Sequence, residues 1–542
     1  MPSTATAPKS ERAARASRAA DAAASAVPAL ESLTRDELVA SHHRLEGQVA
    51  ELARQLQWFR TQLFGSTSEK RVDPNPHQMV LGEAFAPPEP PVEQDKEKIT
   101  YTRGKGPKVR PGDCVTEEGL RFGPDVPVRT IRLPVPGLEG LGPDDYELID
   151  TKVVHRLAQR PASFVVIRYE TPVVKIKASS EIVAGVATTP VLDRSLAEVS
   201  LLVGFLIEKF RFHLPLYRQH QRLEAAGITV ARSTLTNLVR RAIALLEPIV
   251  DAQLASVLRS RTLAMDETPI RVGRSKTKRG RMHQGYYWPV YGDGDEICFV
   301  YAEGRARRVI EETLNGQFRG TILSDGYSAY ASYVAATEHV VHAQCWAHTR
   351  RQFVEARDSE PGAVDEVLDA IGAIYAVEQR IRDRELEGEA KREVRLAHAK
   401  PIVERLFEHV EDQLQRMTLL PSDPYAKALG YLHARRAALA VFLEDPEVAV
   451  DTNHVERVLR SIPMGRKSWL FCWTELGARQ VGVIQSLITT CRLQGVDPTV
   501  YLTDVLQRVA VHPAKEIETL APRLWKAHHG SDPMRSDLAY AD

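Results

Sequence analysis

Two aspartates, Asp266 and Asp325, directly follow short apolar runs typical of β-strands, Leu263 to Met265 and Ile322 to Ser324. In α/β sheets, reactive side chains emerge beside one another at strand ends. Two adjacent carboxylates raise each other's pKa unless a cation neutralises them, and hard oxygen ligands suit Mg²⁺ or Mn²⁺. Two such ions about 3.5–4 Å apart can clamp both oxygens of a phosphoryl displacement. The pair therefore predicts metal-dependent phosphoryl transfer, although either aspartate alone could be structural or solvent-facing.

The candidate for a third carboxylate of this site is Glu456, within the segment DTNHVERVLRSIPMGRKSWLF. Helical periodicity places it on a polar face opposite an apolar stripe. The alternative is a surface ion pair with Arg460 at the i,i+4 spacing. The stripe consists of Val455, Val458, Leu459 and Ile462, and the polar face of Asn453, Glu456, Arg457 and Arg460.

Cys345 and His348 have the C-x₂-H spacing of a metal-ligand pair. A tetrahedral zinc site needs four ligands, and the chain offers no convincing second pair. The other interpretation buries Cys345 on a strand, with Trp346 either in the core or stacked on a base. In that interpretation His348, Arg350 and Arg351 line the site near phosphate.

Two basic segments border these residues. Arg466, Lys467 and Trp469 follow the Glu456 helix, where phosphate contacts and stacking on an unpaired base are expected; alternatively the tryptophan anchors the helix end. Residues 253–282 carry eight lysines and arginines against two acids, a balance of +6. Their phosphate-binding candidates are Arg274, Lys276, Lys278 and Arg279.

Residues 190–250 are predicted to contain a helix-turn-helix with its turn at Gly227 and its second helix starting near Ser233. Residues 203–245 hold seven basic side chains against two acidic ones, a balance of +5. A second helix of this kind inserts into the major groove of DNA, although any basic helical hairpin would share the pattern. The exposed DNA-binding candidates are Arg232, Thr234, Asn237, Arg240 and Arg241.

The elements around the carboxylates predict a mixed sheet. RTLAMDETPIRV is expected to form one strand, Tyr286–Val290 and Ile297–Tyr301 a hairpin, 305–314 a helix, and HVVHAQCWAHTRRQFVEA a strand leading into a helix. The 131 positions from Asp325 to Glu456 are too many for an unstructured loop. Residues 355–416, with 16 acidic and 10 basic side chains, therefore predict a helical insertion, placed at about 355–445, that packs against DNA hairpins or partner subunits.

The N-terminal third of the chain predicts four different segments. Residues 1–30 read as a disordered tail, 31–70 as a coiled-coil helix, 71–112 as a proline-rich linker and 113–185 as a small β-rich module. A helix packed on its own domain is the alternative to the coiled coil, because His42 occupies a core position. The heptad positions are Leu38, Leu45, Leu52 and Phe59, with His42, Val49, Leu56 and Leu63.

Overall composition constrains the class of protein. The 71 basic and 71 acidic residues cancel, which by itself disfavours a nucleic-acid partner, but a sum hides the two basic segments. The chain lacks an apolar run long enough to cross a membrane and a secretory signal. Five scattered cysteines argue against a disulfide framework and for a reducing cytoplasm.

The runs MDETP, SDGYSAY, CWAHTRRQF, NHVERVLR, GRKSWLF and SLITTCRLQGVDPTVYLTDVL resemble the insertion sequence 66 family of bacterial DDE transposases, the TnpC type. The resemblance extends from about Leu33 to about Trp525. It implies a multidomain α/β protein with an RNase H-like catalytic domain at 258–490 and a C-terminal module and tail at 491–542. It also implies the catalytic and metal-binding triad Asp266, Asp325 and Glu456, with Mg²⁺ or Mn²⁺ as cofactor. The family's zinc motif is reduced here to Cys114, so no structural zinc is predicted in the β-rich module, which should fold on its own apolar strands.

The resemblance implies an enzyme that binds element ends and catalyses strand cleavage and strand transfer on double-stranded DNA. It further implies a homo-oligomer, small accessory proteins as additional partners, and a cytoplasmic, nucleoid-associated location. Two alternatives remain open. One is a non-catalytic helix-turn-helix regulator, and the other is a metal-dependent nuclease without strand transfer.

Overall fold

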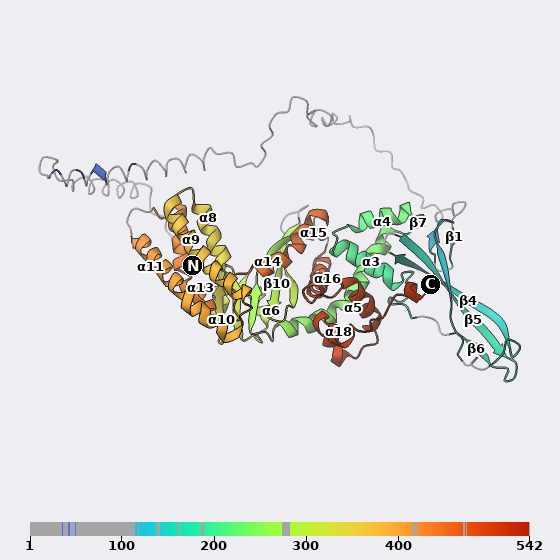
Figure 1. Ribbon diagram of the computed structural model, residues 1–542. Helices are drawn as coiled ribbons and strands as arrows, with labels where there is room; N and C mark the ends of the chain where they lie inside the picture. The colour runs from blue at the N-terminus through green and yellow to red at the C-terminus, as the bar shows by residue number, and fades with distance from the viewer. Residues whose placement is uncertain are drawn as a thin grey trace, which may run out of the picture. The chain divides into compact units, whose positions relative to one another are not determined.

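The fold was examined in a computed structural model of the whole chain (Figure 1). It describes residues 114–540, together with Arg35, Val39, His42, His43 and Val49. Within 114–540, the residues that it does not describe are 117–118, 137, 139–140, 161–162, 186–188, 274–281, 416–419, 470–471 and 473. Two compact units are distinguished by their internal contacts. One comprises 1–99, 355–364 and 423–425, and the other 100–354, 365–422 and 426–542. The predicted tail and linker, and nearly all of the predicted coiled coil, lie outside the described residues.

A mixed sheet is the centre of the larger unit. Its strands are β8 (Thr262–Met265), β9 (Thr268–Val272), β10 (His283–Gly292), β11 (Ile297–Ala302), β12 (Gly320–Ser324) and β13 (Val340–Gln344). Their order is β11-β10-β8-β12-β13, with β9 paired to β10. Strand β10 is antiparallel to both of its neighbours β11 and β8, whereas β8, β12 and β13 run parallel to one another. The predicted mixed sheet and its hairpin are confirmed.

One face of this sheet is covered by α6 (Arg307–Leu314), α7 (Ser328–Val334) and the end of α5 (Arg232–Val257). Strand β8, TLAM, is buried on both faces, as expected for a central strand with parallel pairing. Strand β9 alternates buried and exposed side chains. It accommodates Pro269 because this residue pairs only with Tyr286 of β10, while the parallel bridge on the other side of β9 joins Val272 to Cys472.

The opposite face is covered by α16 (Glu475–Leu493). Gly482 allows this close packing, because a Cβ there would stand 2.3 Å from the carbonyl oxygen of Phe299 on β11. Ser486 Oγ accepts a hydrogen bond from the Phe299 amide at 2.9 Å, and the Tyr287 hydroxyl donates to the Ala478 carbonyl at 2.9 Å. The packing fixes α16 across the antiparallel half of the sheet.

The segment RTLAMDETPIRV does not form the single strand predicted from its sequence. It divides into β8 and β9 at Asp266 and Glu267. The side chain of Asp266 accepts a hydrogen bond from the Glu267 amide at 2.7 Å, which takes that amide out of a strand ladder. The chain then turns so that β9 pairs with β10.

A helical hairpin precedes the sheet in sequence. Helices α3 (Val199–Phe210) and α4 (Leu216–Ala225) are followed by the turn at Gly227, whose φ is +77°, and by α5, which starts at Arg232. The two-residue strand β7 (Ile228–Thr229) in this turn joins β1 (Cys114–Val115) and β2 (Arg121–Phe122) in a three-stranded sheet that was not predicted. Two helices with a glycine turn are thus present, and their DNA contact remains a prediction.

The β-rich region contains β3 (Val128–Arg132), the long hairpin of β4 (Tyr146–Arg160) and β5 (Ser163–Ile176), and β6 (Ile182–Ala184). These strands were expected to form the core of the region by themselves, but they do not. Leu538 of a C-terminal 3₁₀ helix (Asp537–Tyr540) packs into it, and the Tyr169 hydroxyl donates to Asp537 at 2.6 Å. The predicted absence of zinc in this region stays a prediction.

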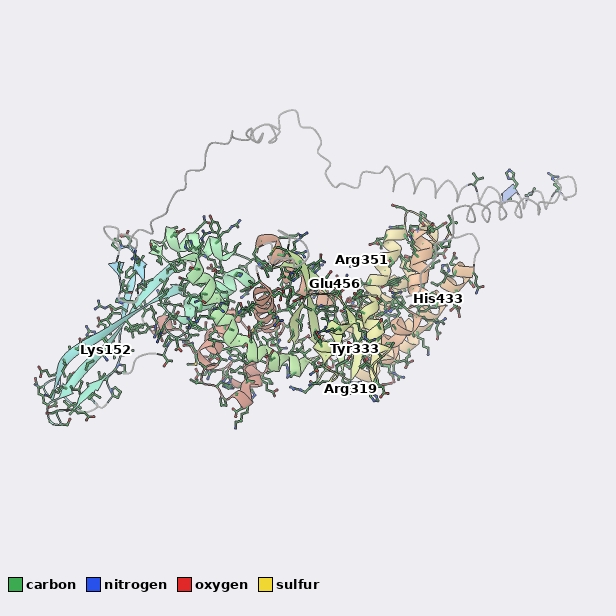
Figure 2. The ribbon with its side chains drawn as sticks, turned by 180° about the vertical axis from the view of Figure 1, so that it is seen from behind. Lys152, Arg319, Tyr333, Arg351, His433 and Glu456 are labelled. Atoms are coloured by element: carbon green, nitrogen blue, oxygen red, sulfur yellow. The ribbon has the colours of Figure 1, made fainter. Side chains whose placement is uncertain are left out.

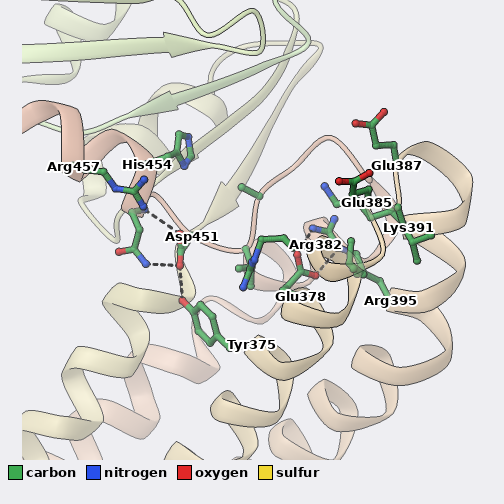
Figure 3. A pocket seen from close by; sticks show the side chains of 15 residues that line it. Tyr375, Glu378, Arg382, Glu385, Glu387, Lys391, Arg395, Asp451, His454 and Arg457 are labelled. Atoms are coloured by element: carbon green, nitrogen blue, oxygen red, sulfur yellow. Dashed lines mark hydrogen bonds and ion pairs between the residues drawn. The ribbon is translucent and has the colours of Figure 1, made fainter. Parts of the chain in front are cut away.

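The region predicted as an insertion is helical. It follows α8 (Trp346–Ala356), the helix predicted after β13, and contains α9 (Pro361–Asp383), α10 (Gly388–Val394), a π-helix (Arg395–Ala399), α11 (Lys400–Gln415), α12 (Pro424–His433) and α13 (Arg436–Glu444). The side chain of Arg395 is fully buried and paired with Glu378 of α9 (Figure 3). It also donates to the carbonyl oxygens of Phe442 at 2.7 Å and Val448 at 3.0 Å. One arginine therefore ties α9 and the π-helix to the chain that leads from α13 toward Glu456.

The remaining helices are α14 (Asn453–Leu459), α15 (Ser461–Trp469), α17 (Pro498–Arg508), a 3₁₀ helix (Ala514–Leu520) and α18 (Pro522–His528). In the described part of the chain, no helix is both long and apolar enough to cross a membrane.

Candidate active site

The register of the parallel strands brings two of the predicted carboxylates together. Leu323 of β12 is aligned with Ala264 of β8, so Asp325 and Asp266 follow the two strands at equivalent positions two residues later. Both strands end there because the aspartate side chains bond locally. Asp266 accepts from the Glu267 amide at 2.7 Å and Asp325 from the Tyr327 amide at 2.9 Å. Neighbouring parallel strands therefore place both carboxylates at one edge of the sheet.

The environment of Asp266 is strongly unfavourable to negative charge. Burial, opposed by the hydrogen bond from the Glu267 amide and assisted by the nearby carboxylates Glu267, Asp325 and Glu456, raises the pKa of this carboxyl to about 7. Asp325 and Glu456 thus both lie within electrostatic reach of Asp266. A carboxylate destabilised in this way gains from a cation placed beside it.

Glu267, which was not predicted, is a fourth acidic residue at this edge. Its side chain is only 2% exposed, forms an ion pair with Arg305 and accepts a hydrogen bond from the Tyr330 hydroxyl at 3.1 Å. Burial and the charge of Asp325 raise its pKa, while Arg305 lowers it. The signal in the sequence was its place inside MDETP, next to Asp266. Its partners come from segments about 40 and 60 residues away, which the sequence pattern could not pair with it.

His342 supports the backbone at Asp325 and was also not predicted. It lies on β13, and its Nε2 is 2.9 Å from Oγ of the buried Ser324, whose hydroxyl donates to the Asp325 carbonyl at 3.1 Å. Burial lowers the pKa of His342 to about 4. The ring is therefore neutral at pH 7, and the assigned hydrogen bonds are consistent with an Nε2–H that donates to the serine.

Glu456 comes to the site from α14. Its Oε1 lies 3.5 Å from Nε2 of His348 and 3.7 Å from a guanidinium nitrogen of Arg351, both on α8. Glu456 and Arg351 are labelled in Figure 2. These contacts replace the predicted alternative of a surface pair with Arg460. The polar face is as predicted, with Asn453, Arg457 and Arg460 exposed and Val455 and Leu459 buried.

Cys345 and His348, the residues of the C-x₂-H motif, lie between Asp325 and Glu456 in the sequence. Cys345 is 1% exposed directly after β13, in agreement with the interpretation that it is buried. Trp346 is fully buried, and its indole N–H donates to the Leu439 carbonyl at 3.0 Å, so it belongs to the core and does not stack on bases. His348 and Arg351 face Glu456, whereas Arg350 is exposed and lines a surface cleft with Arg351 and Asn453.

The basic residues after α14 lie at the margin of this site. Arg466 of α15 donates to the Pro269 carbonyl on β9, and Lys467 is exposed. Trp469 is half-buried against Gly465 and lines a cavity of about 210 Å³ together with Thr236 and Arg240 of α5. The tryptophan therefore lies between the end of α15 and the second helix of the hairpin, a position consistent with either predicted role. The predicted phosphate contacts Arg274, Lys276, Lys278 and Arg279 lie outside the described residues, between β9 and β10.

The predicted base-reading residues are arranged along the first turns of α5. Arg232, Asn237 and Arg240 are exposed, while Thr234 and Arg241 are half-buried. Arg240 donates to Asn237 at 3.0 Å, and Arg241 donates to the Asp193 carbonyl at 3.0 Å. The buried side of α5 is formed by Leu235, Leu238 and Val239, as the sequence predicted.

A larger cavity of about 890 Å³ lies beside α14 (Figure 3). Tyr375 of α9 borders it and donates a hydrogen bond to Asp451 at 2.9 Å, next to His454 and Arg457 of α14. Its lining has as many lysines and arginines as aspartates and glutamates, so it is not a purely phosphate-binding surface.

The three carboxylates suit a divalent cation in donor chemistry but are not arranged as a ligand set. In the described residues, no three side chains of histidine, cysteine, aspartate or glutamate are close enough to hold an ion together. Glu456 is turned toward His348 and Arg351, so a three-carboxylate site would require it to exchange those two partners for the metal. Asp266, with its raised pKa, is the group that would gain most from an ion.

The fold and site define a mixed α/β chain in which clustered carboxylates lie at one edge of a sheet beside a basic helical hairpin. The chain belongs to the IS66 family of transposases. The family model described as "Transposase IS66 family" matches residues 194–480, and that of the "IS66 C-terminal element" matches 486–523.

Three proteins of Sinorhizobium fredii (strain NBRC 101917 / NGR234) are similar to this chain. The uncharacterized protein y4hP is 32% identical over 60% of this chain and 62% of its own length. The uncharacterized protein y4jD is 30% identical over 62% of this chain and 68% of its own length. The uncharacterized protein y4qI is 30% identical over 68% of this chain and 70% of its own length.

Proposed function

We propose that the protein is a DDE transposase that cleaves DNA at the ends of its insertion sequence and joins those ends to target DNA. The observation that carries this proposal is that β8 and β12 bring Asp266 and Asp325 to one edge of the sheet, with Glu456 of α14 within electrostatic reach of Asp266. The family membership supports a transposase role, and the strand order around Asp266 and Asp325 supports an RNase H-like catalytic domain.

Asp266, Asp325 and Glu456 are the proposed catalytic residues and would hold Mg²⁺ or Mn²⁺. A bound ion would lower the pKa of an attacking water and neutralise charge that develops on the phosphate oxygens. His348 and Arg351 are placed to approach a phosphate once Glu456 turns away from them. Buried Glu267 and its Arg305 partner would keep the chain rigid directly after Asp266.

The proposed reaction has two steps. Water attacks the phosphodiester at the element end, the P–O3′ bond breaks, and a 3′-hydroxyl and a 5′-phosphate are left. The freed 3′-hydroxyl then attacks a phosphodiester of the target, forming a new P–O bond while the target's own 3′-oxygen leaves. Both steps are in-line displacements at phosphorus, so the same carboxylates can serve both without a covalent enzyme intermediate.

DNA would be held by separate basic surfaces. We propose that α5 reads the element ends in the major groove through Arg232, Thr234, Asn237, Arg240 and Arg241. Contacts to the backbone near the reacting strand are assigned to Arg274, Lys276, Lys278, Arg279, Arg350, Arg457, Arg466 and Lys467, with Trp469 stacking on an unpaired base. Since one active site has two ends to process, an assembly of at least two protomers is expected. Small accessory proteins of the same element are proposed as additional partners.

The proposal is tested with purified protein, labelled element ends, Mg²⁺ or Mn²⁺ and a target plasmid. Asp266→Asn, Asp325→Asn and Glu456→Gln should each lower cleavage and joining by at least about 100-fold while end binding is retained. Asp293→Asn is the matched control, because Asp293 follows β10 at the opposite edge of the same sheet and the variant keeps an acceptor for the Arg261 amide. Full activity in two of the three active-site variants would refute the triad.

The same assay distinguishes the two alternative functions. Specific end binding without metal-dependent nicking would identify a regulator. Nicking without a joined product would identify a nuclease.

A further inference from the structure

The helix that carries Glu456 begins in an unusual way. Helix α14 has only seven residues, and its N-cap residue is Thr452. A threonine at this position normally uses its side-chain oxygen to accept a hydrogen bond from an amide of the first turn. Here the hydroxyl caps no described amide of α14, and it donates instead to Sγ of Cys345 at 3.3 Å. The Thr452 amide donates to the same sulfur, also at 3.3 Å.

Cys345 is also connected to the second carboxylate. Its amide donates to the Ser324 carbonyl at 3.0 Å, one residue before Asp325. The next residue, Trp346, donates its amide to the Val450 carbonyl at 3.1 Å, two residues before Thr452. The corner between β13 and α8 therefore bonds to the end of β12 on one side and to the start of the Glu456 helix on the other.

His348 completes this arrangement one turn into α8. Its Nε2 approaches Oε1 of Glu456 at 3.5 Å, so the C-x₂-H motif touches α14 at its start and at its functional side chain. The sulfur and the imidazole face different partners, and in the described residues neither belongs to a group of three potential metal ligands.

We propose that Cys345 is a positioning residue whose buried thiol fixes Glu456 relative to Asp325, with His348 orienting the glutamate carboxylate. This inference rests on the proposed function. It gives the C-x₂-H motif a role that is neither a zinc site nor a phosphate contact alone.

The geometry explains why sulfur is suited to this place. One acceptor receives two donors from a single residue, which fixes both the backbone and the side chain of Thr452. A serine oxygen has shorter bonds and contacts than sulfur, so it could not reach both donors without moving the helix start. Burial raises the pKa of the Cys345 thiol, which agrees with a neutral acceptor.

The test compares Cys345→Ala and Thr452→Val with Cys298→Ala. Cys298 is a suitable control because it is also 1% exposed but lies on β11, which β10 separates from β8. The melting midpoint, the dissociation constant for element ends and the single-turnover cleavage rate are measured for each variant. We expect cleavage to fall about 10- to 100-fold in both site variants, with end binding unchanged, because small misplacements of reacting groups cost this much. Cys298→Ala should keep the wild-type cleavage rate even if its melting midpoint falls as far as the midpoints of the two site variants.

Two further variants separate positioning from general damage. Thr452→Ser keeps the hydroxyl donor and should restore most of the rate, whereas Cys345→Ser should restore only part of it. The double variant Cys345→Ala/Thr452→Val should cleave no more slowly than the slower single variant, because Cys345→Ala already removes the hydroxyl–sulfur bond that Thr452→Val removes. Rates that follow the melting midpoint across all variants, or additive losses in the double variant, would overturn the proposal.

Failure of the proposed function would be recognised separately. If the wild-type protein cleaves no element end, the transposase proposal fails, and amide hydrogen exchange across residues 450–459 tests the positioning contact by itself. Exchange there should accelerate in Cys345→Ala and stay unchanged in Cys298→Ala. Unchanged exchange in both would refute the role of Cys345.

Discussion

At the scale of single residues, the state of Asp266 sets the requirements of the site. Its pKa is raised from 3.8 to about 7, chiefly by burial and then by the neighbouring carboxylates. The metal-free folded protein thus binds a proton at this group more tightly than the unfolded chain does. Its contribution to stability is therefore unfavourable above pH 7 and disappears as the pH falls toward 4.

This linkage predicts how Asp266→Asn changes the metal-free protein. At pH 8 the variant should melt at least about 2 °C above the wild type, because it removes a buried carboxylate that must ionise. The difference should shrink as the pH is lowered from 7 to 4. Adding Mg²⁺ or Mn²⁺ at pH 8 should raise the wild-type midpoint and leave the variant unchanged. Thermal unfolding monitored by circular dichroism at several pH values measures all three effects.

The control Asp293→Asn, at the opposite edge of the sheet, should retain the wild-type response to the divalent cation. If the melting midpoint of Asp266→Asn equals that of the wild type at pH 8, then ionisation of Asp266 does not destabilise the folded protein.

The sequence predicted the three carboxylates of the candidate site but not the residues that surround and support them. Asp266 and Asp325 were recognisable because each ends a short apolar strand, and Glu456 because helical periodicity placed it on a polar face. Glu267 and His342 were not recognised, because their importance comes from burial against Arg305, Tyr330 and Ser324. Those contacts join positions far apart in the chain, and local periodicity contains no information about them.

At the scale of secondary-structure elements, strong local patterns were predictive and weak ones were not. The β10–β11 hairpin, the strand before Asp325 and the helices of the insertion had clear periodicity. The two-residue strands β1, β2 and β7 had none, since they exist only because distant segments pair with each other. The break between β8 and β9 was missed because the apolar pattern continues across it, while the side chain of Asp266 bonds to the following amide.

Arg395 links the insertion to the Glu456 segment and gives an element-scale prediction. Arg395→Met would leave Glu378, 7% exposed in its side chain, as a buried carboxylate without its cation, at a cost of about 3–5 kcal/mol in the free energy of unfolding. The double variant Arg395→Met/Glu378→Met should recover part of this loss, because no charge is then buried. Recovery should be incomplete, since the carbonyl groups of Phe442 and Val448 still lack their donor. Chemical denaturation of the single and double variants measures the difference.

Arg392→Met is the matched control, because Arg392 pairs with Glu389 and Glu444 on the surface of the same region. It should leave the free energy of unfolding close to the wild-type value, because exposed ion pairs contribute little to stability. Equal costs for Arg392→Met and Arg395→Met would show that the buried arginine does not hold the insertion to the chain before α14.

At the scale of the whole molecule, the equality of 71 basic and 71 acidic residues conceals an uneven distribution. The helical hairpin carries a local excess of positive charge, and the first turns of α5 expose Arg232 and Arg240. The insertion, by contrast, is acidic over residues 355–416. A protein with no net charge can therefore present one strongly basic surface to DNA, because phosphate binding depends on local charge and releases counterions in proportion to the phosphates contacted.

Binding of element ends should accordingly weaken steeply with salt. The logarithm of the association constant should fall linearly with the logarithm of salt concentration, and Arg232→Ala and Arg240→Ala should each reduce the slope by about 1 when the arginine contacts a phosphate. If Arg240 instead reads a base through its contact with Asn237, its removal should relax sequence preference and leave the slope unchanged.

The control is Arg308→Ala, because Arg308 is an exposed arginine paired with Glu312 on α6. This variant should change neither the salt slope nor the sequence preference. Fluorescence anisotropy with labelled ends between 50 and 300 mM salt, roughly the range in which such binding is lost, measures the slopes. Binding that is independent of salt would exclude a phosphate-contacting surface on α5, whatever the cleavage assays show.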